Sequence, residues 1–341
     1  MAMTSSSIDE VAETPIAAFG LLRTVSYRAW IGGAAAAVAW LGVAWLTAFW
    51  PDAPDSDWEY TGHLAIVFAA VGTGLAFTTF AGLRFAAWQR AQRATPWLLA
   101  LAALLGVWQA VTAKLGLLPM PFFPPPQAIL AVLIDDWPRL GDGVFASLKL
   151  LARGYLVGAA AGFAVGVAIG WSRAVGYWFH PILRFVGPLP ATAWLPLAFF
   201  VFPSSLSAST FLIALATGFP VAVLTWSGVA GVNSAYYDVA RTLGASRWFL
   251  VVKVAIPAAM PHVFVGLFMG LGNSFAVLVV AEMLGVKSGL GWYLQWAQGW
   301  AAYANMYAAL LIMALVCSGL ITLLFCLRDR LLSWQKGLVR W

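Results

Sequence analysis

Residues 236–261 read YYDVARTLGASRWFLVVKVAIPAAMP, and a long apolar segment lies on each side of them. This stretch contains four charged side chains: Asp238, Arg241, Arg247 and Lys253. Charges are costly among lipid chains, so we expect a short polar helix that lies in water between two membrane spans and faces another molecule. Gly244 can open that helix because it has no Cβ atom. Pro257 and Pro261 mark the entry into the next span.

The composition indicates a membrane protein. Of the 341 residues, 62% are hydrophobic and 9% are charged, whereas soluble domains carry about 25% charged residues. Such a chain cannot cover itself with polar groups, so most of its surface faces lipid. The net charge of +6 does not indicate nucleic-acid binding, because the basic residues lie between apolar segments and do not cluster on one soluble domain.

Eight apolar segments are long enough to cross a bilayer, which takes about 20 helical residues. They are residues 30–50, 63–83, 97–117, 148–170, 185–202, 209–231, 262–284 and 303–327. We therefore predict an all-α, polytopic membrane protein with about eight transmembrane helices. The fifth segment is the shortest and contains several prolines, so we expect a broken span there.

The charges of the loops predict the orientation. With the N-terminus in the cytoplasm, most Lys and Arg residues lie on the cytoplasmic side and most loop Asp and Glu residues lie on the other side. The cytoplasmic set holds 14 of the 19 basic residues: Arg23, Arg28, Arg84, Arg90, Arg93, Arg173, Arg184, Arg241, Arg247, Lys253, Arg328, Arg330, Lys336 and Arg340. Because cytoplasmic loops are enriched in Lys and Arg, we expect both termini and residues 236–261 in the cytoplasm.

The polar stretch resembles a loop of bacterial ABC-importer permeases. Asp238-Val239-Ala240, Gly244 after three residues, and Val254-Ala255-Ile256-Pro257 after nine more are similar to the E-A-A…G…I-x-L-P pattern of that family. Asp replaces the leading Glu, and Val replaces the leading Ile. In the family this loop is a cytoplasmic coupling helix that docks into a groove on the ATPase subunit; the alternative is an ordinary basic loop. The resemblance implies seven residues that contact the ATPase: Asp238, Ala240, Arg241, Leu243, Gly244, Ala245 and Arg247.

Two further segments resemble one subfamily, which imports nitrate, taurine, alkanesulfonates and bicarbonate. Residues 180–200, HPILRFVGPLPATAWLPLAFF, are similar to its H-P…P-x-P…A-W-x-P-L run, and residues 279–291, VVAEMLGVKSGLG, to its V-V-A-E-M-L…S-G-L-G run. The resemblance covers residues 97–332, about two thirds of the chain. It implies a six-helix, type I permease core in the bacterial inner membrane. It also implies a homodimer that moves a small anionic solute by alternating access, together with two cytoplasmic ATPases and an external solute-binding protein.

The proline-rich fifth segment is a candidate translocation path. Prolines 188, 190 and 196 surround Trp194 and interrupt the hydrogen bonds of a spanning helix. In a bilayer such backbone is tolerated only inside protein or beside a water-filled path. We therefore expect Pro190, Thr192 and Trp194 along the path. Asn273 and Ser274, polar residues within the seventh span, either join them or hold helices together.

The fourth span carries a glycine at every fourth position: Gly154, Gly158, Gly162, Gly166 and Gly170. They share one narrow helix face, which lets another backbone approach closely. We expect this face to pack against another span or across a dimer axis.

Lys149 and Arg153 lie one turn apart before the glycine face. They either extend to the lipid headgroups or form a candidate mouth for an anion.

Three features are expected on the external side. Residues 127–134, after a run of prolines, predict a short helix, and residues 289–300 predict an amphipathic helix. In the second of these, Trp292, Trp296 and Trp300 share one face and suit the membrane interface. Glu282 is the only acidic residue near a span interior. We expect it to bridge to the external segment from a point where its carboxylate reaches water.

The first two spans precede the region of resemblance. We therefore divide the chain into residues 1–95, with two extra helices, and residues 96–341, the permease domain. The extra helices either anchor the protein and add stability, or they form a docking surface for an accessory subunit.

No G-x-x-x-x-G-K-[ST] or H-E-x-x-H motif occurs, and the three His residues are isolated. We expect no metal, no cofactor and no enzymatic activity in this chain, with ATP and Mg²⁺ bound by the partner ATPase.

Two alternatives to the permease function stay open. An ion-coupled secondary carrier needs intramembrane carboxylates and often has inverted repeats, and a membrane-embedded enzyme needs catalytic groups. The sequence does not identify the solute.

Overall fold

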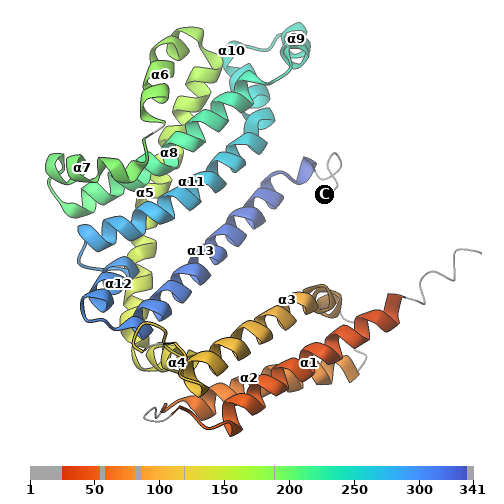
Figure 1. Cartoon of the computed structure of the whole chain (residues 1–341). Helices are drawn as coiled ribbons and strands as arrows, with labels where there is room; N and C mark the ends of the chain where they lie inside the picture. Colours follow the sequence, from red (N-terminus) through yellow and green to blue (C-terminus); the bar gives the residue numbers. More distant parts are fainter. Residues whose placement is uncertain (1–24, 54–57, 81–85, 119, 188, 336–341) are drawn as a thin grey trace, which may run out of the picture. The chain divides into compact units, whose positions relative to one another are not determined.

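The computed structural model describes residues 25–53, 58–80, 86–118, 120–187 and 189–335 (Figure 1). In these ranges every regular element is a helix, which confirms the all-α prediction. The chain forms two compact units, residues 1–131 and 132–341. The predicted domain boundary at residue 95 was drawn from family resemblance, whereas the units divide where chain contacts become sparse.

The first unit contains three long helices and a π-helical turn. They are α1 (Val25–Phe49), α2 (Thr61–Phe80), α3 (Ala86–Gln109) and η1 (Ala110–Lys114). In their core, the rings of Trp40 and Phe68 meet edge-on with centroids 5.7 Å apart, and Ala102 of α3 is completely buried. The indole N–H of Trp40 donates to the carbonyl of Leu98 at 3.1 Å and so joins α1 to α3. These helices correspond to the first three predicted spans.

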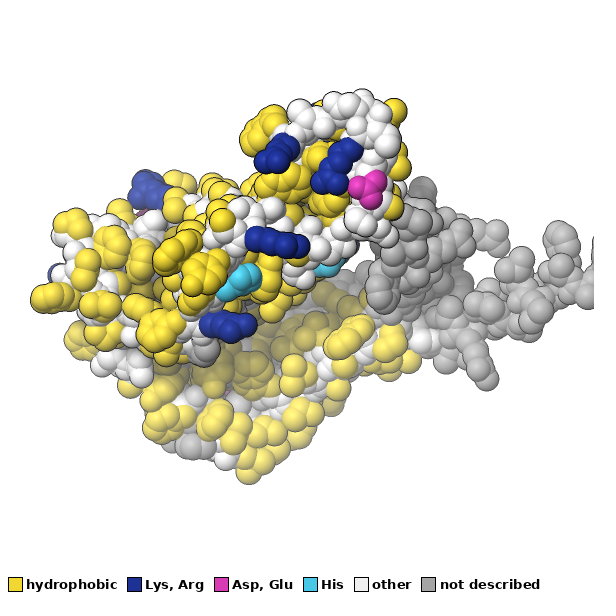
Figure 2. All heavy atoms as spheres, turned by 90° about the horizontal axis from the view of Figure 1, so that it is seen from above, with side chains coloured by type: hydrophobic (Ala, Val, Ile, Leu, Met, Phe, Trp, Pro, Cys, Tyr) yellow, Lys and Arg dark blue, Asp and Glu magenta, His cyan; other side chains and the backbone are white. Residues whose placement is uncertain are grey.

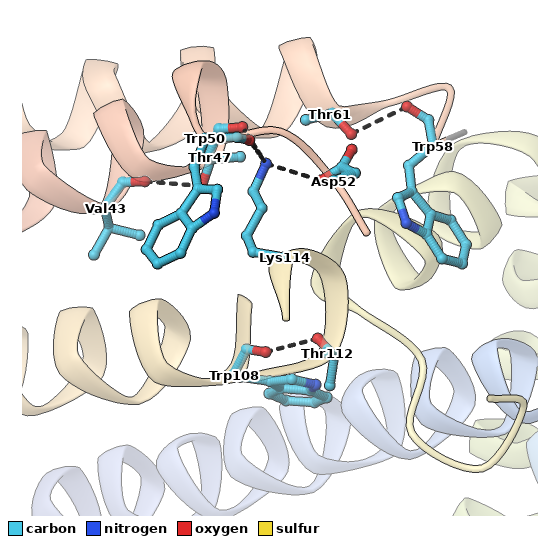
Figure 3. A network of polar contacts seen from close by, with 9 residues as sticks. All are labelled: Val43, Thr47, Trp50, Asp52, Trp58, Thr61, Trp108, Thr112 and Lys114. Carbon is cyan, nitrogen blue, oxygen red and sulfur yellow. Dashed lines mark hydrogen bonds and ion pairs between the residues drawn. The ribbon is translucent and has the colours of Figure 1, made fainter. Parts of the chain in front are cut away.

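A buried cation joins the end of α1 to the end of η1 (Figure 3). Lys114 Nζ donates to the carbonyl oxygens of Thr47, at 2.9 Å, and of Trp50. It also forms an ion pair of 2.8 Å with Asp52, and the Lys114 side chain is only 1% exposed. The last carbonyls of a helix have no partner within it, so Lys114 satisfies two carbonyls at the end of α1 while Asp52 compensates its charge.

The second unit holds the remaining long helices, after α4 (Pro126–Asp135), which confirms the short helix expected at 127–134. Its elements are α5 (Trp137–Trp171), α6 (Arg173–Val186), η2 (Ala191–Trp194), α7 (Leu195–Val201), α8 (Ser205–Ala230), α9 (Ser234–Thr242), α10 (Arg247–Phe249), η3 (Leu250–Ala255), α11 (Ile256–Leu284), α12 (Leu290–Gly299), α13 (Tyr303–Leu331) and η4 (Ser333–Gln335).

The glycine face of α5 packs against α8. A Cβ atom added at Gly158 would lie 2.3 Å from the carbonyl oxygen of Ala214, and one at Gly162 would lie 2.4 Å from that of Gly218. Real Cβ atoms do not approach so closely, so the two backbones touch because side chains are missing. This confirms that the face packs against another span. The helix α8 also packs against α11, where Gly270 lies against Thr217.

Seven described helices are long and apolar enough to cross a membrane, and one bent pair raises the number to eight if it counts as a single span. This confirms the prediction of about eight spans. The bent pair joins α6 to residues 191–201 at an angle of 89°. It is the proline-containing fifth segment, where Pro190 precedes the short 3₁₀ helix η2. The break expected from the prolines is therefore present.

Two predicted boundaries were wrong. The fourth span was expected to begin at residue 148, but α5 begins at Trp137. Its extra turns are mixed in polarity, yet they carry Leu140, which packs with Leu290 and Tyr293 of α12. The fifth span was expected to begin at residue 185, which misses most of α6. That helix is amphipathic, so a search for uniformly apolar segments does not detect it.

Candidate functional site

The polar stretch projects from one end of the second unit. Asn233 begins α9, and its side-chain oxygen accepts a hydrogen bond from the Ala235 N–H at 2.9 Å. Asp238 and Arg241 form an exposed ion pair of 3.2 Å on α9. No residue from 233 to 249 is buried. A helix that packs so little against its own chain has a surface available to a partner.

Gly244 ends α9 with a specific backbone turn. Its φ is +81°, in the left-handed region that L side chains avoid. The Ala245 N–H donates to the Ala240 carbonyl at 3.0 Å, and the Gly244 N–H donates to the Arg241 carbonyl at 2.9 Å. This pair of bonds is the Schellman motif, which requires a left-handed residue after the helix. A Cβ atom at Gly244 would meet nothing within 4 Å, so the backbone conformation, not space, requires glycine.

The exposed surface of this stretch is amphipathic. Leu243 is 83% exposed and Trp248 is 75% exposed, beside the charged side chains of Asp238, Arg241 and Arg247. Figure 2, which views the chain from above, shows Lys and Arg side chains scattered among hydrophobic ones at this end of the second unit. The seven residues predicted to contact an ATPase lie together on this surface, with Ala240 and Ala245 half-buried and the other five exposed.

The projecting stretch continues directly into a membrane span. Ser246 caps α10 by accepting from the Phe249 N–H at 3.3 Å. The π-helix η3 then leads into α11, which has a proline at its start, Pro257. No turn or bend interrupts residues 247–284. A displacement of the exposed stretch can therefore reach α11 and the polar residues in the middle of that span.

Halfway along the spans lies a cavity of about 280 Å³. The break after α6, the middle of α8 and the middle of α11 line it, with Gly187, Pro190, Thr192, Phe219, Pro220 and Asn273 among the residues. No charged side chain lines it, and its polar side chains are those of Thr192 and Asn273. Such a cavity can pass a small polar solute and holds no fixed charge that would bind an ion tightly.

The structure brings together three of the five residues predicted for a path, namely Pro190, Thr192 and Asn273. Trp194 packs beside the buried core around Leu212 instead. Ser274 is fully buried, and its hydroxyl donates to the Leu271 carbonyl at 2.9 Å. The sequence analysis did not select Phe219 and Pro220 of α8, although the proline within a span was a signal available in the sequence.

The candidate mouth residues lie elsewhere. Lys149 and Arg153 are exposed on α5, next to the buried Leu150, Leu151 and Gly154, and they do not line this cavity. Since α5 begins at Trp137, both residues lie well inside the helix rather than at its start.

Glu282 joins three elements at the end of the unit opposite α9. Its Oε2 accepts from the Ser147 hydroxyl of α5 at 2.9 Å and from the Gly291 N–H of α12 at 2.8 Å. The Ser147 hydroxyl oxygen also accepts from the Leu290 N–H at 2.9 Å. The predicted bridging role is confirmed, but the expected contact with water is wrong, because Glu282 is 1% exposed.

In the described part of the chain, no three His, Cys, Asp or Glu side chains lie together in a way that could hold a metal ion. The arrangement instead consists of an exposed amphipathic stretch joined by one helix to an uncharged cavity at mid-depth.

The chain is similar to known transport proteins. The family model described as "Binding-protein-dependent transport system inner membrane component" matches residues 155–336, which is more than half of the chain. The nitrate import permease protein NrtB of Leptolyngbya laminosa is 33% identical over 240 residues, covering 68% of this chain and 84% of that protein.

Two relatives carry names with other solutes. The putative aliphatic sulfonates transport permease protein SsuC of Bacillus subtilis is 30% identical over 240 residues, covering 69% of this chain and 86% of that protein. The bicarbonate transport system permease protein CmpB of Synechococcus elongatus is 31% identical over 208 residues, covering 59% and 72%. The matches to NrtB and SsuC leave about a third of this chain without a counterpart, and the match to CmpB leaves about two fifths.

Proposed function

Because this chain belongs to the inner membrane components of binding-protein-dependent transport systems, the permeases of ABC importers, we propose that its solute is a small anion of the nitrate, sulfonate or bicarbonate kind. It is a transmembrane permease subunit of an ATP-driven importer. Family membership favours this function over an ion-coupled carrier. The names of the relatives support the solute class. The uncharged cavity is compatible with it, because a transported ion must bind weakly enough to leave.

The exposed stretch 233–249 is the binding surface for the subunits that drive transport. A cytoplasmic ATPase dimer, which binds ATP and Mg²⁺, contacts this surface on each permease copy. The exposure of Leu243 and Trp248 supports the proposal, since large apolar side chains beside charges are typical of protein interfaces. When the ATPases close, they displace α9 and α10, and the continuous helix through η3 transmits the displacement to α11 and Asn273.

Two copies of the chain complete the path. The cavity offers two polar side chains, Thr192 and Asn273, and a second copy that faces it closes the passage. Rigid-body movement of the two copies then opens the path to one side at a time. Both termini and α9 face the cytoplasm, and the opposite end, with α12, receives the external solute-binding protein.

Reconstitution tests this function. The permease, co-expressed with the ATPase and binding protein of its own transport system, is placed in proteoliposomes and supplied with labelled nitrate, bicarbonate or an alkanesulfonate. We expect uptake of one of these anions that requires ATP hydrolysis and persists when a protonophore collapses the proton gradient. Uptake that needs the gradient and proceeds without the ATPase would identify a secondary carrier. ATP-driven uptake of neutral solutes alone would disprove the anion assignment.

A further inference from the structure

A second cavity, of about 400 Å³, lies at the end of the second unit opposite α9 and α10. Figure 1 shows α12 at that end. The start of α5, the loop after α11 and the helix α12 line it, with Arg139, Asp142, Gly143, Lys287, Trp292 and Trp296 among the residues. Its volume is in the range of small-molecule sites, about 300–1,000 Å³. The proposed translocation path does not pass through it.

The cavity carries charges of both signs. Asp142 of α5 and Lys287 of the loop are exposed, and within the described residues neither forms an ion pair or a hydrogen bond with its side chain. Arg139 is 70% exposed and makes only a 3.3 Å contact with Asp136. The other Asp136 oxygen accepts from the Tyr293 hydroxyl at 2.8 Å. Two cationic groups and one carboxylate are therefore available to a ligand.

Tyr293 stays a hydrogen-bond donor at physiological pH. Burial is the main reason that the pKa of the Tyr293 phenol is raised to about 12; the hydrogen bond with Asn305 lowers this pKa, and Asp136 contributes to the rise. Asp136 is thus occupied by Tyr293 and Asn305, and the carboxylate that remains free at the cavity is that of Asp142.

The aromatic residues of the cavity suit the level of lipid headgroups. The helix α12 is short and lies between the ends of two apolar spans, α11 and α13. Trp292 is 40% exposed, and both Trp292 and Trp296 line the cavity. Indole rings favour the boundary between acyl chains and water, where one edge is apolar and the N–H is wet.

The wall of the cavity is rigid. Gly289 has φ of +103°, and a Cβ atom there would lie 2.2 Å from Glu282 Oε1. The buried Glu282 of α11 accepts from Ser147 of α5 and from Gly291 of α12 and so joins the three helices around the loop before α12. A Cβ atom at Gly143 would lie 3.2 Å from Leu290 Cδ2. The charged groups are therefore held on a framework that exists before a ligand binds.

We propose that this cavity binds the headgroup of an amine-bearing phospholipid, phosphatidylethanolamine. The phosphate lies between Arg139 and Lys287, the ammonium group faces Asp142, and the two indoles contact the glycerol and upper acyl region. A phosphate with no amine leaves Asp142 without a partner and beside an anion, so the mixed charges favour a zwitterion. Ethanolamine is preferred over choline because its ammonium N–H groups can donate to the Asp142 carboxylate, whereas a trimethylammonium group has no N–H. The site does not depend on which side of the membrane α12 faces.

Native mass spectrometry of the full-length permease tests this site. The protein is released from nanodiscs that contain equal parts of phosphatidylethanolamine, phosphatidylglycerol and phosphatidylcholine. We expect one phosphatidylethanolamine per protomer to be retained in preference to the other two. Lys287→Gln should lower that retention about tenfold, which corresponds to the loss of one charge-assisted hydrogen bond. Asp142→Asn should shift the preference toward phosphatidylglycerol.

Arg173→Gln is the matched control, because it removes one exposed basic charge at the start of α6, and it should leave retention unchanged. Equal retention of the three lipids would mean that no selective site exists. If Arg173→Gln lowers lipid retention as strongly as Lys287→Gln does, then retention depends on the net charge of the protein and not on this cavity, and the proposal is wrong. If Lys287→Gln weakens binding of the solute-binding protein while lipid retention stays the same, the cavity is a protein docking site and the lipid proposal is wrong.

Discussion

Gly244 shows how a single residue sets the turn between the exposed helix α9 and the span that follows it. Its φ of +81° completes the Schellman motif that ends α9, and the chain then turns into α10 and the long helix beyond. Any residue with a Cβ atom costs about 1–2 kcal/mol in this conformation. Asn tolerates it best after glycine.

Substitutions at Gly244 should therefore follow backbone preference rather than size. We expect Gly244→Pro to abolish ATP-driven uptake, since proline fixes φ near −65°, and Gly244→Val to reduce it severely. Gly244→Asn should keep most of the activity. All three variants should insert into the membrane at normal levels, as immunoblots of membrane fractions would show. Normal uptake with Gly244→Pro would mean that the turn does not transmit the movement.

At the scale of elements, the contact between α5 and α8 depends on missing side chains. Four-residue spacing puts five glycines on one face of α5, and the carbonyls of Ala214 and Gly218 lie directly against two of them. Lipid gives little hydrophobic reason for two apolar helices to associate, so the association depends on close packing.

Adding one methyl group at this contact should push α5 and α8 apart. We expect Gly158→Ala to destabilise the permease by about 1–3 kcal/mol, the usual cost of over-packing, since its Cβ atom would meet the Ala214 carbonyl at 2.3 Å. Gly141→Ala on the same helix is the control, because a Cβ atom there meets nothing within 4 Å. The apparent melting temperature in detergent measures both. Equal melting temperatures for the two variants would contradict tight packing of α5 on α8.

At the scale of the whole molecule, the extra N-terminal helices are fastened to α3. The resemblance to the permease family begins at residue 97, and Lys114, which lies within it, binds Thr47, Trp50 and Asp52, which precede it. This favours a stabilising anchor over a loosely attached docking module. Removing one partner of a buried ion pair costs about 3–5 kcal/mol because a charge is left uncompensated.

Deletion of α1 and α2 tests this link. We expect a permease that lacks residues 2–80 to melt at a clearly lower temperature than the full chain, because Lys114 loses its cage. Adding Lys114→Leu should restore part of the loss, whereas the same substitution in the full chain should destabilise it by leaving Asp52 unpaired. Lys114→Leu should therefore raise the melting temperature of the deletion variant and lower that of the full chain. Equal effects of Lys114→Leu in both would show that the cage contributes nothing.

Much of the molecule could be predicted from sequence. Composition and run length predict the number of spans, the prolines around residue 190 predict the break, and the motif around Gly244 predicts an exposed helix with a glycine turn. These are properties of short segments, and they depend on local chemistry: apolar length, a missing amide hydrogen and a missing Cβ atom. The start of α5 and most of α6 were missed because their residues are of mixed polarity.

The sequence by itself determined that the chain is an all-α membrane protein, which stretch projects from it, and which family it belongs to. Only the tertiary structure decided that Thr192 and Asn273 face one cavity while Ser274 does not, that Glu282 is buried between three elements, and that Lys114 is caged by the loop after α1. The reason is physical: such contacts join residues up to 135 positions apart. Only the packing of the helices brings them together.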